Sequence, residues 1–271
     1  MGKSLYHFYG YKVEGVYKDL ADLETSPKPA KYPTDGTFNR YNTVWVGDLK
    51  FKDMNGDGLI DENDKTDIGD PNPKFTFGFN NTFRYKDFDL NIFLNGQYGN
   101  KVFNYLGMKL IHMNSAWVNQ LSDVNDRAQL VPIDPDKDYS QGVVVNGVTV
   151  WNWYDDITNV QVANADTKTP RATTADPNDN DAISDRYIED GSYLRIKNIT
   201  LGYNLKKEWT KKIHLEKVRV YANVQNVATF THYSGYDPEI GASTASANVI
   251  GLDNGRYPSP TVWSFGLNVT F

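Results

Sequence analysis

Residues 263–271 read Trp263-Ser264-Phe265-Gly266-Leu267-Asn268-Val269-Thr270-Phe271. Every second position carries a large apolar side chain, and the positions between carry small or polar ones. Side chains of a β-strand point alternately to its two faces, so this period of two predicts a strand with one apolar and one polar face. The apolar face of this last strand consists of Trp263, Phe265, Leu267, Val269 and Phe271.

Five earlier segments show the same alternation. Residues 75–85 and 88–98 flank the two-residue turn Lys86-Asp87 and are predicted to form a hairpin. Residues 199–205 and 218–224 form a second pair, joined by a lysine-rich turn. A weaker pattern near the N-terminus predicts one more strand, with Tyr9, Tyr11, Val13 and Tyr17 on one side.

The polar faces of these strands carry Asn, Thr, Gly, Gln and Ser rather than the Lys and Glu of a soluble sheet. Such side chains are typical of the watery interior of a transmembrane β-barrel, whose other face contacts lipid. Lipid contact requires every backbone polar group to be paired, which an open sheet does not achieve. Short connections, at 86–87 and 206–217, alternate with long ones, at 18–74, 99–190 and 232–260. We therefore predict an all-β, antiparallel outer-membrane barrel segment, with residues 99–190 as a long extracellular loop.

The composition excludes several other classes. Of 271 residues, 14% are aromatic and none is cysteine, so disulfides and thiolate sites are excluded. A net charge of −6 argues against a nucleic-acid partner. No run of about 18 apolar residues predicts a transmembrane helix. The first residues, Met1 to Ser4, lack the apolar segment of a signal peptide, so we expect an exported chain to be processed or truncated.

Residues 53–64 fit a twelve-residue calcium loop of the EF-hand type at most positions. Gly58 stands at position six, where the backbone turns sharply, and Ile60 at position eight is the usual apolar anchor. Asp64 at position twelve is shorter than the usual Glu, as in dockerin-type loops. The alternative is an Asx-rich turn that binds no ion. The predicted ligands are Asp53, Asn55, Asp57, Leu59, Asp61 and Asp64.

Motifs of known enzyme classes are missing, and the four histidines have no metal-ligand spacing, so no catalytic residue is predicted. Trp151, Trp153 and Tyr154 suit stacking on a sugar, although packing within a loop or an interface with a partner is the simpler interpretation. The segment 176–185 is interpreted as a solvated acidic loop. Asn146-Gly147, between two short valine-rich runs, predicts a small hairpin inside the long loop.

Several stretches resemble SusC/RagA-family TonB-dependent outer-membrane proteins, and the resemblance covers nearly the whole chain. They are residues 47–53 (GDLKFKD), 68–81 (IGDPNPKFTFGFNN), 184–203 (SDRYIEDGSYLRIKNITLGY), 221–226 (YANVQN), 235–239 (GYDPE) and 255–271.

The resemblance implies about the last six strands of a barrel of about 22 strands, in the outer membrane of a Gram-negative, Bacteroidetes-like bacterium. It implies import of glycans or peptides with a SusD-like lipoprotein. TonB would act through an N-terminal part, and neither that part nor the plug domain is present here. It also implies that the residues of the last apolar face, ending at Phe271, signal to the barrel-assembly machinery.

Two other classes remain open at this point. One is a secreted, calcium-stabilised β-sandwich that binds carbohydrate, and the other is a fragment of a glycan-degrading enzyme. A soluble sandwich would pack Phe77, Leu90, Leu201 and Phe265 into a closed core, whereas the barrel would leave them on an outward face.

Overall fold

The computed structural model describes residues 3–114, 117–240 and 249–271, which form two compact units. The strand unit comprises the described residues of Met1–Tyr6, Asp70–Phe103 and Glu189–Phe271. The loop unit comprises those of His7–Gly69 and Asn104–Ile188. Long strands make up most of the strand unit, whereas the loop unit is mainly irregular chain with short strands and helical turns. The chain as a whole is therefore of the predicted all-β class. The α-helices are short: α1 (Leu20–Thr25), α2 (Tyr105–Leu110) and α3 (Lys207–Thr210). No helix in the described ranges has the length and apolarity needed to cross a membrane.

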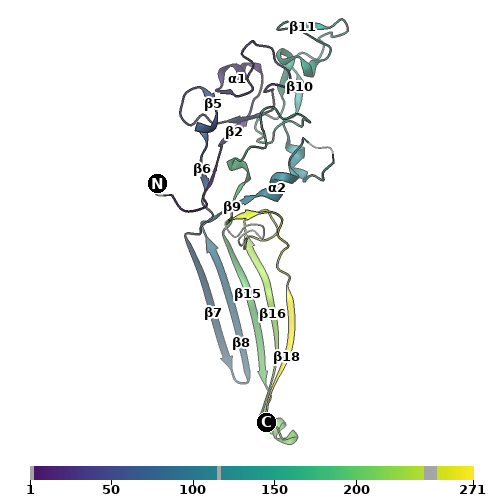
Figure 1. Ribbon diagram of the computed structural model, residues 1–271. Coiled ribbons are helices and arrows are strands. Elements are labelled where there is room, and N and C mark those ends of the chain that lie inside the picture. Colours follow the sequence, from purple (N-terminus) through teal and green to yellow (C-terminus); the bar gives the residue numbers. More distant parts are fainter. Residues whose placement is uncertain (1–2, 115–116, 241–248) are drawn as a thin grey trace. The chain divides into compact units, whose positions relative to one another are not determined.

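One antiparallel sheet of five long strands builds the strand unit (Figure 1). In spatial order the strands are β18 (Val262–Thr270), β16 (Lys217–Thr231), β15 (Tyr193–Asn204), β8 (Phe88–Tyr98) and β7 (Phe75–Tyr85). The 11 residues of β7 extend about 35 Å at the usual rise of a strand, a length that suits a membrane-spanning strand. The predicted hairpin at Lys86-Asp87 and the predicted pairing of 199–205 with 218–224 are both confirmed.

The two short connections lie at the same end of this sheet, because both follow the last paired residues there, Tyr85 with Phe88 and Asn204 with Arg219. Lys86 adopts a left-handed conformation, with φ of 53°, which closes the tight turn. The longer turn contains α3 and a 3-10 helix at Lys211–Ile213. At the opposite end the chain forms a small sheet of β14 (Ile188–Asp190), β9 (Lys101–Asn104) and β17 (Leu252–Asp253).

A β-bulge keeps the faces of β15 aligned along its length. Ile196 pairs with Leu94 and Asn198 pairs with Phe93, so Lys197 is an extra residue that has no partner on β8. Because of this extra residue, Leu194 and Ile196 lie on the same face as Ile199, although their positions differ in parity. A strict period of two would have placed them on opposite faces.

The loop unit consists of short strands in pairs. They are β1 (Phe8–Gly10) with β6 (Thr66–Gly69), β2 (Val13–Val16) with β4 (Leu49–Phe51), β3 (Lys28–Pro29) with β5 (Leu59–Ile60), β10 (Leu130–Pro132) with β13 (Val160–Val162), and β11 (Val143–Val145) with β12 (Val148–Val150). The last pair confirms the hairpin predicted at Asn146-Gly147.

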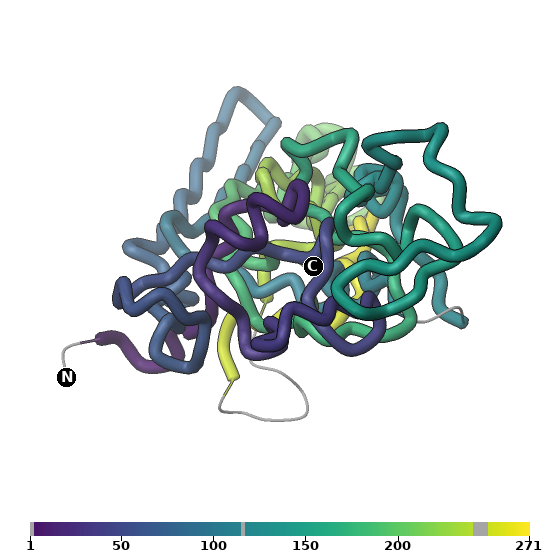
Figure 2. The backbone as a smooth tube through the Cα atoms, turned by 90° about the horizontal axis from the view of Figure 1, so that it is seen from above, coloured from purple at the N-terminus to yellow at the C-terminus, as the bar shows by residue number. Residues whose placement is uncertain are grey.

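A single hydrophobic core joins the two chain segments of the loop unit. Trp45, Leu23 and Leu49 of the first segment pack in the same cluster as Ile157 and Val160 of the second. Backbone hydrogen bonds also link the segments, from Val162 to Lys18 and from Arg171 to Gly47. Figure 2 shows residues 7–69 (purple to blue) and 104–188 (teal to green) lying side by side.

The weaker pattern from Tyr9 to Tyr17 does not form one more strand of the long sheet. The segment forms the short strands β1 and β2, which pair with β6 and β4 within the loop unit rather than joining the long sheet. Gly10 lies so close to the backbone of Ile183 that a Cβ atom there would come within 2.3 Å of the Ile183 carbonyl oxygen. Tyr17 is buried in the core of the loop unit, where a barrel strand would have left it on a face.

The interpretation of 176–185 as a solvated loop is also wrong, because several of its side chains are buried. Asn180 accepts a hydrogen bond from the Leu49 amide (2.7 Å), and Asn178 donates one to the Leu49 carbonyl (2.9 Å). Asp181 contacts His112, and burial together with Asp176 and Asp179 raises the pKa of Asp181 to about 6. The segment is therefore part of the folded loop unit.

Candidate functional site: a two-faced sheet

The long sheet sorts its side chains by polarity across all five strands. Directly paired residues share a face, so the register can be followed from β7 to β18. One such row is Phe83, Leu90, Leu201, Ala222 and Phe265, and the next is Tyr85, Phe88, Tyr203, Val220 and Leu267. A row on the other face is Thr82, Asn91, Thr200, Asn223 and Ser264. We call the two sides the apolar face and the polar face.

The apolar face is not the core of the strand unit. Phe265 is 79% exposed, Leu201 49% and Phe77 40%, and Leu90 is half-buried. Soluble proteins rarely leave so large a contiguous apolar surface uncovered. This observation is the opposite of what a soluble sandwich requires of these four residues.

The polar face is connected by hydrogen bonds between strands. Asn91 donates to Asn80 (2.8 Å) and to Thr82 (2.9 Å). Thr200 donates to Asn223 (2.7 Å). The amide and hydroxyl groups of neighbouring strands therefore satisfy one another, which keeps this face polar without adding net charge.

Two arginines on the polar face were not singled out from the sequence. Arg219 reaches across Gly202 to Asp89 on β8 in a bidentate ion pair, with Nε–Oδ1 and Nη2–Oδ2 distances of 2.9 and 2.5 Å. A Cβ atom on Gly202 would come within 2.3 Å of this guanidinium group, so only glycine fits beneath it. Tyr221 lies over Gly266 in the same way.

Arg195 binds the segment that follows β16 to the sheet. Its guanidinium group donates to Asp237 (2.5 Å), Glu239 (2.6 Å) and Thr229 (2.8 Å). Both Arg195 and Asp237 are buried. Burial disfavours the charged carboxylate, but the Glu239 amide and Arg195 outweigh it, so the pKa of Asp237 lies below its usual value. The sequence signal for this cluster was a charged residue, Arg195, between the two apolar residues Leu194 and Ile196.

Lys197, the bulge residue, adds a second ionic contact with the same segment, because its ammonium group lies 3.0 Å from Glu239. Re-aiming a side chain is a common role of a bulge. Residues 237–239 are thus held over the polar face by cations of β15, which positions this segment against the sheet.

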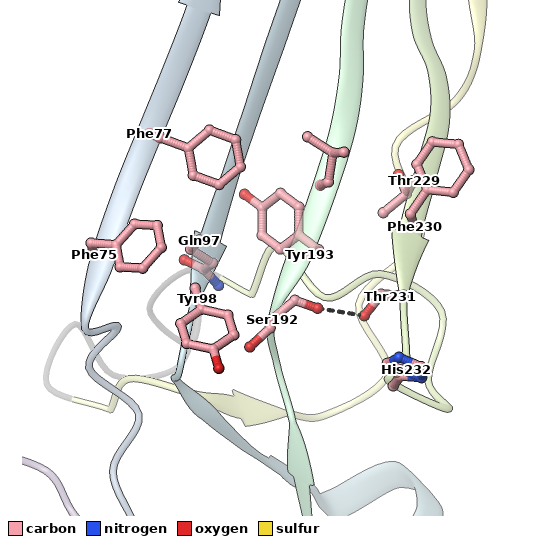
Figure 3. A pocket seen from close by; sticks show the side chains of 11 residues that line it. Phe75, Phe77, Gln97, Tyr98, Ser192, Tyr193, Thr229, Phe230, Thr231 and His232 are labelled. Carbon is pink, nitrogen blue, oxygen red and sulfur yellow. Dashed lines mark hydrogen bonds between the residues drawn. The ribbon is translucent and has the colours of Figure 1, made fainter.

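A groove of about 600 Å³ opens at the end of the sheet opposite the short turns. Figure 3 shows Phe75, Phe77 and Tyr98 along one side and Phe230 and His232 along the other. Phe77 pairs with Gly96, where a Cβ atom would come within 2.6 Å of the ring, so the missing side chain makes room for Phe77. Thr231 closes the lower rim by donating to the Ser192 carbonyl (2.9 Å). Most of the groove's lining is aromatic or uncharged, and His232 is the one titratable imidazole among the residues that line it.

The predicted calcium loop has oxygen ligands of the right chemistry, but they face the loop's own amides. Asp53 accepts from Gly56 (2.6 Å) and Gly58 (2.8 Å), and these amides hold the pKa of its carboxyl group below the usual value. Asp64 accepts from Met54 and Asp61, both at 2.8 Å. Within the described ranges, no three His, Cys, Asp or Glu side chains form a group that could hold a metal ion. Calcium binding therefore stays a prediction.

The other predicted residues lie in different places. Trp263, Phe265, Leu267 and Val269 belong to β18, and Phe271, directly after it, is 90% exposed. In the loop unit Trp151 is exposed, whereas Trp153 packs against the core. The ring of Tyr154 lies 4.6 Å below the Arg40 guanidinium group. Trp153 and Tyr154 thus have packing partners within the loop unit, and of the three rings predicted to suit sugar stacking Trp151 is the most exposed.

Comparison with known proteins identifies relatives along the whole chain. It is 33% identical over 274 residues to the TonB-dependent receptor P3 of Formosa agariphila, covering 100% of this chain and 22% of the relative. Along its whole length the chain is related to the TonB-dependent receptors. It is also 27% identical over 223 residues to the TonB-dependent receptor SusC of Bacteroides thetaiotaomicron, covering 82% of this chain and 17% of SusC. No family model matches the sequence.

The fold agrees with that of a solved transporter. The structure of the RagAB peptide transporter matches with a TM-score of 0.55 at 17% identity, covering 98% of this chain and 23% of that chain. The chain thus spans about a fifth of the length of its relatives. TonB-dependent receptors are outer-membrane proteins, and both organisms belong to the Bacteroidetes. The relatives are named as receptors and transporters, which fits a chain that is not an enzyme.

Proposed function

We propose that this chain forms part of the wall of a TonB-dependent importer in the outer membrane, namely the last strands of a barrel of about 22 strands. The observation that carries the proposal is the sorting of side chains in rows across β7, β8, β15, β16 and β18. An exposed apolar face suits contact with lipid, and a hydrogen-bonded polar face suits an aqueous interior. The short turns would then lie on the periplasmic side and the loop unit on the extracellular side.

We propose that the complete importer takes up oligosaccharides or peptides together with a SusD-like lipoprotein, and contacts TonB through a part outside this chain. The support comes from the relatives: one is SusC, and the matched structure is that of a peptide transporter. The described residues have no charge pattern that selects between the two substrate classes, because the polar face is mainly amide and hydroxyl.

Replacing Ile199 with arginine is expected to destabilise the membrane-inserted protein by about 2–4 kcal/mol, because Ile199 lies near the middle of β15 on the apolar face. Thr200→Arg is the matched control. It places the same side chain on the polar face and costs about 1 kcal/mol through the lost hydrogen bond to Asn223. Heat-modifiable gel migration and urea unfolding of the protein that carries this chain measure insertion and stability. Equal tolerance of arginine at both positions would refute lipid contact.

The last strand remains our proposed signal for the barrel-assembly machinery, through Trp263, Phe265, Leu267, Val269 and Phe271. The same insertion measurement on protein lacking Phe271 tests it: lower yield is expected, and an unchanged yield would count against the signal.

Calcium binding by residues 53–64 is a separate proposal, supported by the spacing of the oxygen ligands. Calcium is expected to raise the melting temperature of the loop unit and chelator to lower it, because binding to the folded state alone stabilises that state. Asp53→Asn with Asp57→Asn should abolish the shift. A melting temperature insensitive to millimolar calcium would leave the loop as an Asx-rich turn.

A further inference from the structure

A second groove crosses the apolar face near the short turns. Ala222 forms its floor, because this small side chain stands between Leu201 and Phe265 in one row of paired residues. Tyr203, Val220 and Leu267 of the next row continue the walls, and the volume is about 580 Å³. No charged residue lines this groove. Its chemistry therefore suits a hydrocarbon chain.

The turn beyond this groove is basic in a chain whose net charge is negative. Residues 206–217, which we call the basic turn, contain five lysines against two glutamates, whereas the other short turn, Lys86-Asp87, is neutral. The five lysines are exposed, and no ion pair engages them among the described residues. Trp209 and Ile213 of the same turn are also exposed, as is typical of side chains at a membrane interface. The lysines of this turn are Lys206, Lys207, Lys211, Lys212 and Lys217.

The basic turn and the groove are consecutive along the same two strands. Tyr203 and Val220 border the groove, and the last pair before the turn is Asn204 with Arg219. At about 3.3 Å per residue, Lys206 follows Tyr203 by about 10 Å of chain. A single amphiphile can therefore contact both, with its apolar part beside Ala222 and its polar head at the lysines.

We infer that the groove and the basic turn together bind one anionic phospholipid, with an acyl chain along Ala222 and the phosphate group at the lysines. This inference rests on the proposed placement of the strands in a membrane. Lysine clusters next to a membrane-embedded surface attract anionic lipid headgroups, and each lysine near the surface strengthens binding about fivefold. The short turns are placed on the periplasmic side of the outer membrane. The bound lipid would therefore come from the inner leaflet of that membrane, which consists of phospholipid, rather than from its outer leaflet.

The test titrates the purified receptor that carries this chain with phosphatidylglycerol, or with phosphatidylcholine of the same acyl chains, and counts bound lipid by native mass spectrometry. The unaltered protein should bind phosphatidylglycerol at least about tenfold more tightly. Changing Lys206, Lys207, Lys211 and Lys212 together to glutamine should remove this preference. The matched control changes Lys31, Lys52, Lys109 and Lys168, four exposed lysines of the loop unit, to glutamine and should keep it.

A second pair of variants tests the groove. Ala222→Phe should fill it and weaken binding of both lipids about tenfold, the equivalent of two acyl methylenes. Ala228→Phe, on the same strand and face but outside the groove, should have no effect. Equal affinity for the two lipids in the unaltered protein, or a retained preference for phosphatidylglycerol in the glutamine variant, would each overturn the inference. If Ala222→Phe does not fold, the lysine variants decide.

Failure of this inference is distinguishable from failure of the proposed function. The lysine variants are expected to insert at the unaltered level, because they touch no residue of the apolar face. Tolerance of Ile199→Arg would refute the membrane placement itself, whereas normal insertion without lipid preference would refute only the phospholipid site.

Discussion

Replacing Arg195 with alanine is expected to cost about 3–5 kcal/mol, because it leaves the buried carboxylate of Asp237 without its cation. The effect should be local. Amide hydrogen exchange should accelerate at Glu239, whose amide donates to Asp237, and at residues near it. Urea unfolding of the receptor and exchange mass spectrometry measure the two effects.

The control for this prediction is Arg219→Ala. Arg219 makes two bonds to Asp89, whereas Arg195 makes one bond to Asp237 and one to Glu239. The side chains of Arg219 and Asp89 are 22% and 20% exposed, against 3% and 5% for Arg195 and Asp237. Water replaces part of the lost interaction there, so the cost should be about 1 kcal/mol. Adding Asp237→Asn to Arg195→Ala should recover part of the stability by removing the orphaned charge. Equal losses for both arginines would show that burial of the Asp237 pair does not matter.

Replacing Trp45 with alanine is expected to destabilise the loop unit by about 3–5 kcal/mol, because Trp45 is fully buried in its core. Membrane insertion should remain at the unaltered level, since that core contains no residue of the strand unit. Limited proteolysis of the loop unit, with gel migration of the inserted protein measured in parallel, separates the two outcomes.

Trp151→Ala provides the matched control, because it removes the same side chain from an exposed position, 63% accessible to solvent. Its effect on stability should stay within about 0.5 kcal/mol. Loss of insertion in Trp45→Ala would contradict separate cores, and equal protease sensitivity of both variants would contradict the role of Trp45.

Much of the long sheet was predictable because the two-residue period is a local property of the sequence. The hairpin at Lys86-Asp87 and the pairing of β15 with β16 follow from alternation and turn chemistry alone. The extra residue Lys197 was not predictable, because a bulge shows in the sequence only as a break of parity. The weak alternation from Tyr9 to Tyr17 led to a wrong prediction of one more strand in the long sheet. Short buried strands such as β1 and β2 have the same two-residue period as long ones, so the period alone does not distinguish them.

The core of the loop unit was not predictable, because its contacts join residues far apart in the chain. Asp48 pairs with Arg171 at 2.7 Å across 123 positions, and Asn180 binds the Leu49 amide across 131. No local pattern specifies such partners. The arginine cluster at Asp237 depends on a similar return of the chain, 42 residues after Arg195. Sequence reasoning placed both segments in polar loops and missed how they fold back.

The glycines beneath Arg219 and Tyr221 influence how much room the polar face leaves above it. Long side chains that stand upright would project from a strand into the space beside it, but here they lie along the sheet over Gly202 and Gly266. If the polar face borders an aqueous passage, as proposed, a solute there would meet the flat side of a guanidinium group and of a phenol ring, not their tips. The absence of a side chain at Gly202 and Gly266 would thereby widen the passage beside such a wall. The wall itself would stay polar, because Arg219 and Tyr221 remain on it.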